Sequence, residues 1–250
     1  MLKLFILVVL GVSVHAIDWC QMEAEFCDGE EHIACEPNSF GTPTNVRNIQ
    51  VVQLSDADKQ SIVDRHNNFR RKVAQGQESG LPSASKMEEM YWDDNLAFVA
   101  GEHVKHGNFE HDQCRASTAY PSAGQNLATG SSSVAYSSII AQVLGHVDMW
   151  YNKEMPIVRD DMPSCVGTFT LSPNCLKAGH FTAVVKESSF AVGCAVATFE
   201  TQIQGNWWYS VLTTCDYANT NMLDEAVYTQ GTTCSACGSI GKTCSNGLCA

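Results

Sequence analysis

The stretch Gly179-His180-Phe181-Thr182-Ala183-Val184-Val185 is the segment on which the predicted fold depends. A glycine and a histidine lead into a run of apolar and β-branched residues, which favours a strand with one buried face. We therefore predict a strand over 181–186, with His180 at its mouth. An imidazole at that position can face a cleft, so the other residues of the cleft have to be sought elsewhere in the chain.

The first sixteen residues have the pattern of a secretory signal. Lys3 supplies a positive charge, 4–12 form an apolar run, and Val14-His15-Ala16 fits the small-residue cleavage pattern. A membrane anchor is the alternative, but it would need about 20 apolar residues. We expect the mature chain to begin at Ile17 and to be soluble and extracellular.

The net charge restricts the possible partners, and the cysteine content indicates the compartment. The formal net charge is -12, which argues against nucleic acid and against anionic membranes as partners. We also expect no membrane insertion, because no other stretch is long and apolar enough for a span. All 12 cysteines follow the signal, and an even number in an oxidising compartment predicts disulfides, up to six of them. Four cysteines lie close together in the tail, at Cys234, Cys237, Cys244 and Cys249. Zinc binding by these four is the alternative to a pair of disulfides, which a secreted chain favours.

Periodicity predicts helices in the first part of the chain and strands in the last part. A helix begins at the cap Ser55 and ends near Gly76, because apolar residues recur at helical spacing between them. Further helices are expected from Asp93 or Asp94 to Gly107 and over 133–154. We expect irregular structure over 17–54, 106–130 and 155–178, and strands over 181–186, 190–199 and 207–217. This order indicates an α+β class with helices on both sides of a sheet.

Seven short motifs occur in a fixed order along this pattern. They are His66-Asn67-x-x-Arg70, Trp92-x-x-x-Leu96-Ala97, His111-Asp112-x-Cys114, Gly124-Gln125-Asn126, Trp150-Tyr151, Gly179-His180-Phe181-Thr182 and Cys215-Asp216-Tyr217. The set resembles the CAP superfamily, which includes cysteine-rich secretory proteins, antigen 5 and pathogenesis-related proteins of group 1. The Gly-Gln-Asn form and His32-Ile33-Ala34-Cys35 are most similar to antigen 5 proteins of insect venom and saliva, in particular those of blood-feeding flies. The resemblance covers roughly residues 18–228.

The resemblance implies a three-layer α-β-α sandwich over 55–228. It would be preceded by a cysteine-rich extension over 17–54 and followed by a disulfide-bonded tail over 229–250. It also implies disulfides, which pair Cys20 with Cys35, Cys27 with Cys114, Cys165 with Cys175, and Cys194 with Cys215. The four tail cysteines would pair among themselves, in an order that we leave open.

Many CAP proteins carry two histidines and two glutamates in a cleft. The histidines correspond to His111 and His180, whereas Gln125 and Lys153 stand at the glutamate positions. Glu154 is one residue further along the expected helix, about 100° around its axis, so we do not expect it to face the cleft.

These substitutions weigh against chemistry in the cleft. An amide cannot act as a base near neutral pH, a lysine repels a cation, and two histidines make a poor zinc site. We therefore expect no catalytic residue, no metal and no cofactor. A metal-dependent hydrolase or protease that uses the histidine pair is the alternative.

An apolar ligand site is the first binding hypothesis. CAP relatives include lipid, sterol and eicosanoid binders, and gaps between helices can form suitable channels. The candidate walls are Phe69, Val73, Phe98 and Ile139, which we expect to face inward on three helices. The alternative is that these residues are ordinary core.

The triplet Arg159-Asp160-Asp161 is the second binding hypothesis. Some antigen 5 relatives of blood-feeding flies carry Arg-Gly-Asp on a loop and act as integrin antagonists. The triplet keeps the arginine and an acid two residues later, which an integrin reads as a basic contact and a metal-bound carboxylate. Asp160 replaces the glycine and restricts the backbone, so binding would be weakened. A solvated acidic turn is the alternative.

Together these observations predict a secreted, non-enzymatic protein of saliva or venom. Its expected partner is a small apolar mediator or a host integrin, and the expected outcome is interference with haemostasis or inflammation. We expect a monomer that binds no nucleic acid.

Overall fold

The computed structural model describes residues 17–250, so the predicted signal over 1–16 lies outside the described residues. A five-stranded sheet has the order β1-β4-β5-β3, and β2 joins it through β4. The strands are β1 (Val46–Val51), β2 (Tyr91–Trp92), β3 (Gly124–Ser132), β4 (Ala191–Ile203) and β5 (Asn206–Tyr217). The helices are α1 (Trp19–Phe26), α2 (Asp56–Ala74), α3 (Asp94–Val104), α4 (Ile139–Asn152), α5 (Met155–Asp160), α6 (Pro173–Lys177) and α7 (Gly179–Val185). Among residues 17–250, no helix is both long and apolar enough to cross a membrane.

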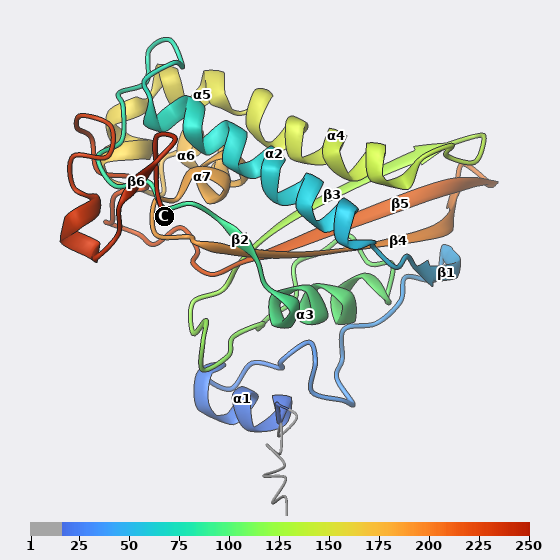
Figure 1. Ribbon diagram of the computed structural model, residues 1–250. Coiled ribbons are helices and arrows are strands. Elements are labelled where there is room, and N and C mark those ends of the chain that lie inside the picture. The colour runs from blue at the N-terminus through green and yellow to red at the C-terminus, as the bar shows by residue number, and fades with distance from the viewer. Residues whose placement is uncertain (1–16) are drawn as a thin grey trace, which may run out of the picture.

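The sheet is covered on both faces, as Figure 1 shows, with α2 and α4 on one side and α3 on the other. β4 and β5 form a hairpin in the middle of the sheet, and their side chains alternate between the two layers. Val196 packs in the core under α2 and α4, whereas Ala197 packs in the core under α3. A strand buried on both faces reads as a continuous apolar run, which explains the sequence of β4. The predicted α-β-α sandwich is confirmed.

The helix α2 begins and ends where its sequence predicts. Ser55 and Asp58 form a reciprocal capping box at its start. On its buried face, Nδ1 of His66 donates to the carbonyl of Ile62, and the hydroxyl of Tyr217 donates to Nε2 of His66 over 2.9 Å. Burial lowers the pKa of His66 to about 4, so this imidazole is neutral at neutral pH. The histidine of the first motif is therefore a structural residue.

The stretch from Gly179 to Val185 forms a helix, α7, and not the predicted strand. Every side chain from Phe181 to Val185 is buried, and a short run that is apolar on all sides fits a buried helix as well as a strand. Tertiary contacts select the helix, because the buried guanidinium of Arg70 donates to the carbonyls of Val184 and Lys186. The same group donates to the carbonyls of Glu88 and Glu187, so one arginine joins three segments.

Four further expectations need correction. The segment 106–130 was expected to be irregular, but β3 begins at Gly124 and pairs with β5 over nine residues. Its small and polar residues carry little strand propensity, so pairing determines its conformation. The third helix, α4, runs over Ile139–Asn152 and is shorter than the predicted 133–154, because Ser138 caps its start. The expected loop over 155–178 contains α5, a π-helical turn over Pro163–Gly167 and α6. The expected loop over 17–54 contains α1 and β1.

The helix α3 lies against β4 at one glycine. A Cβ atom on Gly193 would stand 2.0 Å from the backbone nitrogen of Ala97, in the first turn of α3. Only glycine permits this approach. The contact fixes the start of α3 over the sheet and, with it, the space between α3 and β1.

Six disulfides join all the cysteines. Cys20–Cys35, Cys27–Cys114, Cys165–Cys175 and Cys194–Cys215 confirm the pairing that the family resemblance implied. The tail pairs within itself, as Cys234–Cys244 and Cys237–Cys249. It carries a 3-10 turn over Cys237–Ile240 and a small two-stranded sheet of β6 (Cys244–Ser245) and β7 (Leu248–Cys249). Leu248 is fully buried in the main core, so the tail packs onto the sandwich.

Candidate functional site

The structure brings His111 and His180 to one hollow on the surface, together with Gln125. This hollow, which we call the cleft, measures about 390 Å³ and is also lined by Asn126, Lys177 and Asn221. His180 opens α7, Gln125 lies on β3, and His111 lies in the segment between α3 and β3. The predicted histidine pair and Gln125 therefore come from three separate segments.

Glu154 contacts His180 of the cleft, although it is not among the residues that line the cleft. Lys153, the C-cap of α4, and Glu154 both keep right-handed helical backbone angles, so their side chains point in different directions. Nδ1 of His180 donates to Oε1 of Glu154 over 2.6 Å, and the backbone N–H of Phe181 donates to Oε2 over 2.9 Å. Lys153 is exposed and does not line the cleft. One carboxylate therefore stands beside the histidine pair.

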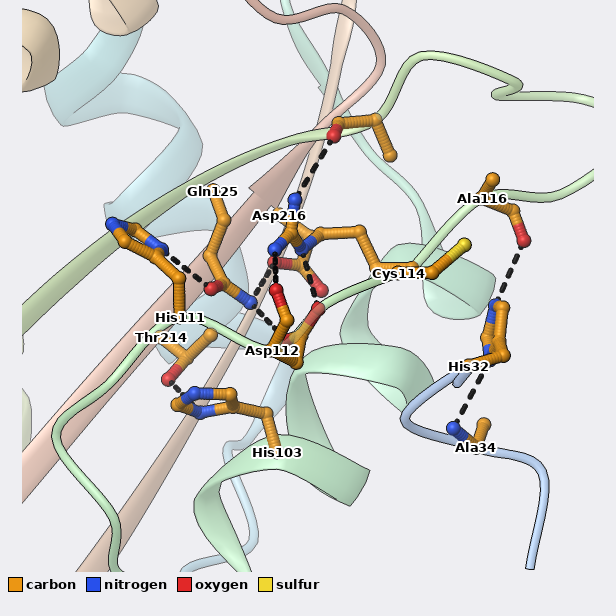
Figure 2. A network of polar contacts seen from close by, with 12 residues as sticks. His32, Ala34, His103, His111, Asp112, Cys114, Ala116, Gln125, Thr214 and Asp216 are labelled. Carbon is orange, nitrogen blue, oxygen red and sulfur yellow. Dashed lines mark hydrogen bonds and ion pairs between the residues drawn. The ribbon is translucent and has the colours of Figure 1, made fainter. Parts of the chain in front are cut away.

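Gln125 connects His111 to two buried carboxylates, as Figure 2 shows. Its Oε1 accepts from Nδ1 of His111 over 2.8 Å. Its Nε2 donates to Asp112 over 2.6 Å and to Asp216 over 3.0 Å. Nε of Arg115 lies 2.9 Å from Oδ1 of Asp112. Only an amide can accept from the histidine and donate twice to acids, so Gln125 suits this position.

The network holds one guanidinium and two carboxyl groups, and burial shifts the pKa values of its members. One guanidinium, on Arg115, faces the two carboxyl groups of Asp112 and Asp216. Burial raises the pKa of Asp216 well above its usual range, and the charge of Asp112 adds to the effect. Burial also lowers the pKa of His111, which is therefore neutral at neutral pH. The raised pKa of Asp216 favours a proton on that carboxyl group, which brings the network closer to electrical neutrality.

The cleft orients its histidines but does not gather a metal-ligand set. Both imidazoles use Nδ1 to donate, to Gln125 and to Glu154, so a metal ion would have to bind through Nε2. In residues 17–250, the only group of three or more acidic, histidine or cysteine donors within 4.8 Å of one another is Asp161, Cys165 and Cys175. Its two cysteines form a disulfide. Catalytic zinc usually has three protein ligands, so the cleft residues do not fit that site.

The four residues predicted to line an apolar channel do not share one gap. The ring of Phe69 on α2 stacks on the buried Tyr151 of α4, with centroids 4.0 Å apart. Val73 is fully buried, and Ile139 packs at the edge of the same core. These three contribute to the core between α2 and α4. Phe98 was expected to face inward, but it lies on α3, on the other side of the sheet, and is 47% exposed.

Phe98 lines a different hollow, which we call the α3–β1 pocket. It measures about 370 Å³ and lies between α3 and the chain that continues from β1, with β4 as its floor. Its apolar lining includes Val51, Leu54, Trp92, Phe98 and Ala195. Trp19 of α1 stacks on the outer side of Phe98, with ring centroids 5.5 Å apart. Sequence reasoning missed this pocket because Val51 and Leu54 lie in the segment that we took to be a loop.

The triplet Arg159-Asp160-Asp161 does not form a projecting loop. Arg159 and Asp160 are the last two residues of α5, and Asp161 follows that helix directly. The Nε atom of Arg159 lies 3.4 Å from Oδ1 of Asp160. The carboxylate of Asp161 accepts from the hydroxyl of Ser172 over 3.3 Å. The arginine and the second acid are therefore directed to different neighbours.

Asp112, Arg115 and Asp216 are site residues that sequence reasoning did not single out. Asp112 and Asp216 were part of the quoted motifs, which is the signal that could have identified them. Their role depends on burial, since both side chains are inside the protein.

Comparisons with known proteins agree with this geometry. Residues 63–217 match the model of the cysteine-rich secretory protein family, CAP. "Venom allergen-1" of Aedes albopictus is 31% identical over 220 residues, which cover 86% of this chain and 82% of that protein. Among solved structures, BmVAL-1 has a TM-score of 0.61 at 20% identity and covers 79% of this chain and 95% of its own. The Hookworm Platelet Inhibitor has a TM-score of 0.52 at 20% identity and covers 80% and 93%. The fold, the cleft and these matches show that the chain belongs to the cysteine-rich secretory protein (CAP) family.

Proposed function

We propose that this chain is a secreted, non-enzymatic binding protein that sequesters a small apolar molecule in the α3–β1 pocket. The observation that carries the proposal is the pocket itself, a hollow of about 370 Å³ with an aromatic and aliphatic lining. Pockets that bind small molecules are typically concave and mostly apolar, with a few polar groups. Removal of a host mediator by this route would interfere with haemostasis or inflammation.

Exposed apolar side chains in the pocket supply a driving force for binding. Phe98 is 47% exposed and Val51 is 41% exposed, and both line the hollow. A ligand that covers them removes apolar surface from water, which contributes about 25 cal/mol per Å². After the cost of association, a neutral probe of about twelve heavy atoms should bind with a Kd of about 10–100 μM.

The cleft supports binding or structure better than catalysis. Gln125 cannot take up a proton, and Glu154 is held by two hydrogen bonds, to His180 and to the backbone of Phe181. Asp216 is buried, and burial raises its pKa well above the usual range. We therefore propose no reaction for the histidine pair.

Integrin binding through Arg159 is the weaker of the two binding hypotheses. A relative in fold is named a platelet inhibitor, but a likeness of 20% identity concerns the fold alone. The helical position of Arg159 and the contact between Asp161 and Ser172 do not present the two charges together. An apolar mediator is accordingly the partner that we propose.

Calorimetric titration with butyl hexanoate tests the proposal. Gly101 lines the pocket on α3, and a Cβ atom there meets nothing within 4 Å, so Gly101→Leu fills the hollow without a backbone clash. Gly145→Leu on α4 is the matched control, because Gly145 is also unobstructed and lies outside the pocket. We expect the wild type and Gly145→Leu to bind alike and Gly101→Leu to bind at least about tenfold more weakly. Absence of binding to the wild type, or equal binding to Gly101→Leu, would overturn the proposal.

A further inference from the structure

One tryptophan of β2 lies between two hollows. Trp92 lines the α3–β1 pocket, and it also lines a second hollow of about 360 Å³, which we call the α2–β2 hollow. Within residues 17–250, no other residue lines both. The start of α2 divides in the same way, since Lys59 lines the pocket and Gln60 lines the hollow. The two spaces are therefore neighbours, and Trp92 forms the wall that they share.

The α2–β2 hollow offers apolar surface next to this wall. Its apolar lining includes Val63, Met90, Tyr91 and Trp92. Tyr91 is 50% exposed, so a chain that covers it removes apolar surface from water. Asp64 and Glu89 add two carboxylates to the lining, and Lys242 is already paired with Glu88 over 2.6 Å. The hollow therefore favours a neutral chain over a carboxylate.

The indole of Trp92 is held in place by a charged pair. Its Nε1–H donates to Oδ1 of Asp94 over 3.0 Å. Nζ of Lys59 lies 3.0 Å from the same oxygen and 5.6 Å from the centre of the indole ring. Trp92 also packs against the main apolar core. These contacts fix the orientation of the side chain that separates the two hollows.

From these observations we infer that Trp92 sets the upper limit on the length of the apolar ligand, an inference that rests on the function proposed above. A neutral chain of about twelve heavy atoms occupies the α3–β1 pocket. A longer chain meets the indole, and its additional methylenes stay in water, where they add little to the affinity. Without the indole the chain continues into the α2–β2 hollow, where each buried methylene strengthens binding about fourfold. Trp92 is thus a specificity-determining residue of the pocket.

Butyl hexanoate and butyl octanoate, which differ by two methylenes, measure this limit. The protein is titrated into each ester in a calorimeter, because the longer ester is sparingly soluble. We expect the wild type to bind the octanoate no more than about twofold more tightly than the hexanoate, and Trp92→Leu to bind it at least about fivefold more tightly. The ratio of the two affinities is the readout, because loss of the indole contact weakens both esters alike. Trp207→Leu is the matched control and should keep the wild-type ratio, since Trp207 is an exposed tryptophan of β5 that lines neither space.

Asp94→Ala tests the same wall while the indole is still present. The side chain of Asp94 is 81% exposed, so its removal leaves the core intact and frees the indole N–H. We expect this variant to bind the octanoate at least about threefold more tightly than the hexanoate, and its ratio decides the question if Trp92→Leu does not fold. Equal ratios in the wild type and in the deciding variant, whether small or large, would overturn the length limit while leaving the apolar pocket in place. Failure of butyl hexanoate to bind the wild type would overturn the proposed function itself.

Discussion

Nδ1 of His180 lies 2.6 Å from Oε1 of Glu154, although the two residues are 26 positions apart in the chain. This contact joins the end of α4 to the start of α7, and the second oxygen of Glu154 accepts from the backbone of Phe181. Acidic groups at the first turn of a helix stabilise it. The N–H of Phe181, from which Glu154 accepts, is also one that has no partner within the helix. Glu154 therefore orients the histidine and supports the helix that carries it.

Replacement of Glu154 should lower stability. We expect Glu154→Ala to reduce the free energy of unfolding by about 1–3 kcal/mol, because a helix N–H and Nδ1 of His180 both lose their acceptor. Lys153→Ala is the matched control and should change it by less than about 0.5 kcal/mol, since Lys153 is exposed. Urea denaturation measures both values. Equal effects of the two substitutions would contradict the role assigned to Glu154.

A glutamate at position 125 should be tolerated less well as the pH rises. Gln125→Glu replaces the amide that donates to Asp112 and Asp216 with a third acid beside a single guanidinium. At pH 5 protonation relieves part of the repulsion, and at pH 7.5 it does not. We expect a loss of Tm that is larger at pH 7.5 than at pH 5, measured by differential scanning calorimetry. A loss of the same size at both values would count against the neutral network.

Acid should destabilise the protein through its buried histidines. Burial lowers the pKa of His66 and of His146 to about 4. Below the ordinary histidine pKa of about 6.5, the unfolded chain binds protons that the folded chain does not, so stability falls between about pH 6.5 and 4. Each histidine accounts for about 3 kcal/mol of that loss, and the raised pKa of Asp216 acts in the opposite direction.

His146→Gln isolates one share of this pH dependence. Nδ1 of His146 is 2.9 Å from the hydroxyl of Thr213, and a glutamine can replace that contact without titrating. Urea denaturation between pH 7 and pH 4.5 should show a shallower decline of unfolding free energy for the variant. A decline as steep as that of the wild type would show that His146 does not contribute.

Platelet aggregation separates the two binding hypotheses. If the protein acts by sequestration, it should delay aggregation that is triggered by a small apolar agonist and leave aggregation triggered by thrombin unchanged. Gly101→Leu, which fills the α3–β1 pocket, should abolish the delay, whereas Arg159→Ala should not alter it. Loss of the effect in Arg159→Ala, or inhibition of both triggers, would favour the integrin hypothesis.

The fold could be predicted from the sequence where local pattern and tertiary packing agree. Ser55 and Asp58 form a capping box at the predicted helix start, and the two long strands β4 and β5 form where the sequence predicts strands. Prediction failed where packing determines conformation. Phe181 to Val185 have no polar face to distinguish a helix from a strand, and the carbonyl of Val184 accepts from Arg70, more than a hundred residues away.

The candidate site could be predicted only in part. His111, Gln125 and His180 do meet in one cleft, because the family motifs fix their places on β3, α7 and the segment before β3. The role of Glu154 depends on the packing of α7 against the end of α4, a tertiary contact that no local sequence pattern marks. The α3–β1 pocket depends on how the chain diverges from β4 after Val52, a tertiary property with no local sequence signal.

The position of a bound apolar molecule is the most direct test of the central claim. A crystal structure of the wild-type protein with butyl hexanoate should show the molecule between α3 and β1, in contact with Leu54, Trp92 and Phe98. Density between α2 and α4, with Phe69 displaced from Tyr151, would contradict this account and favour the channel first predicted from the sequence.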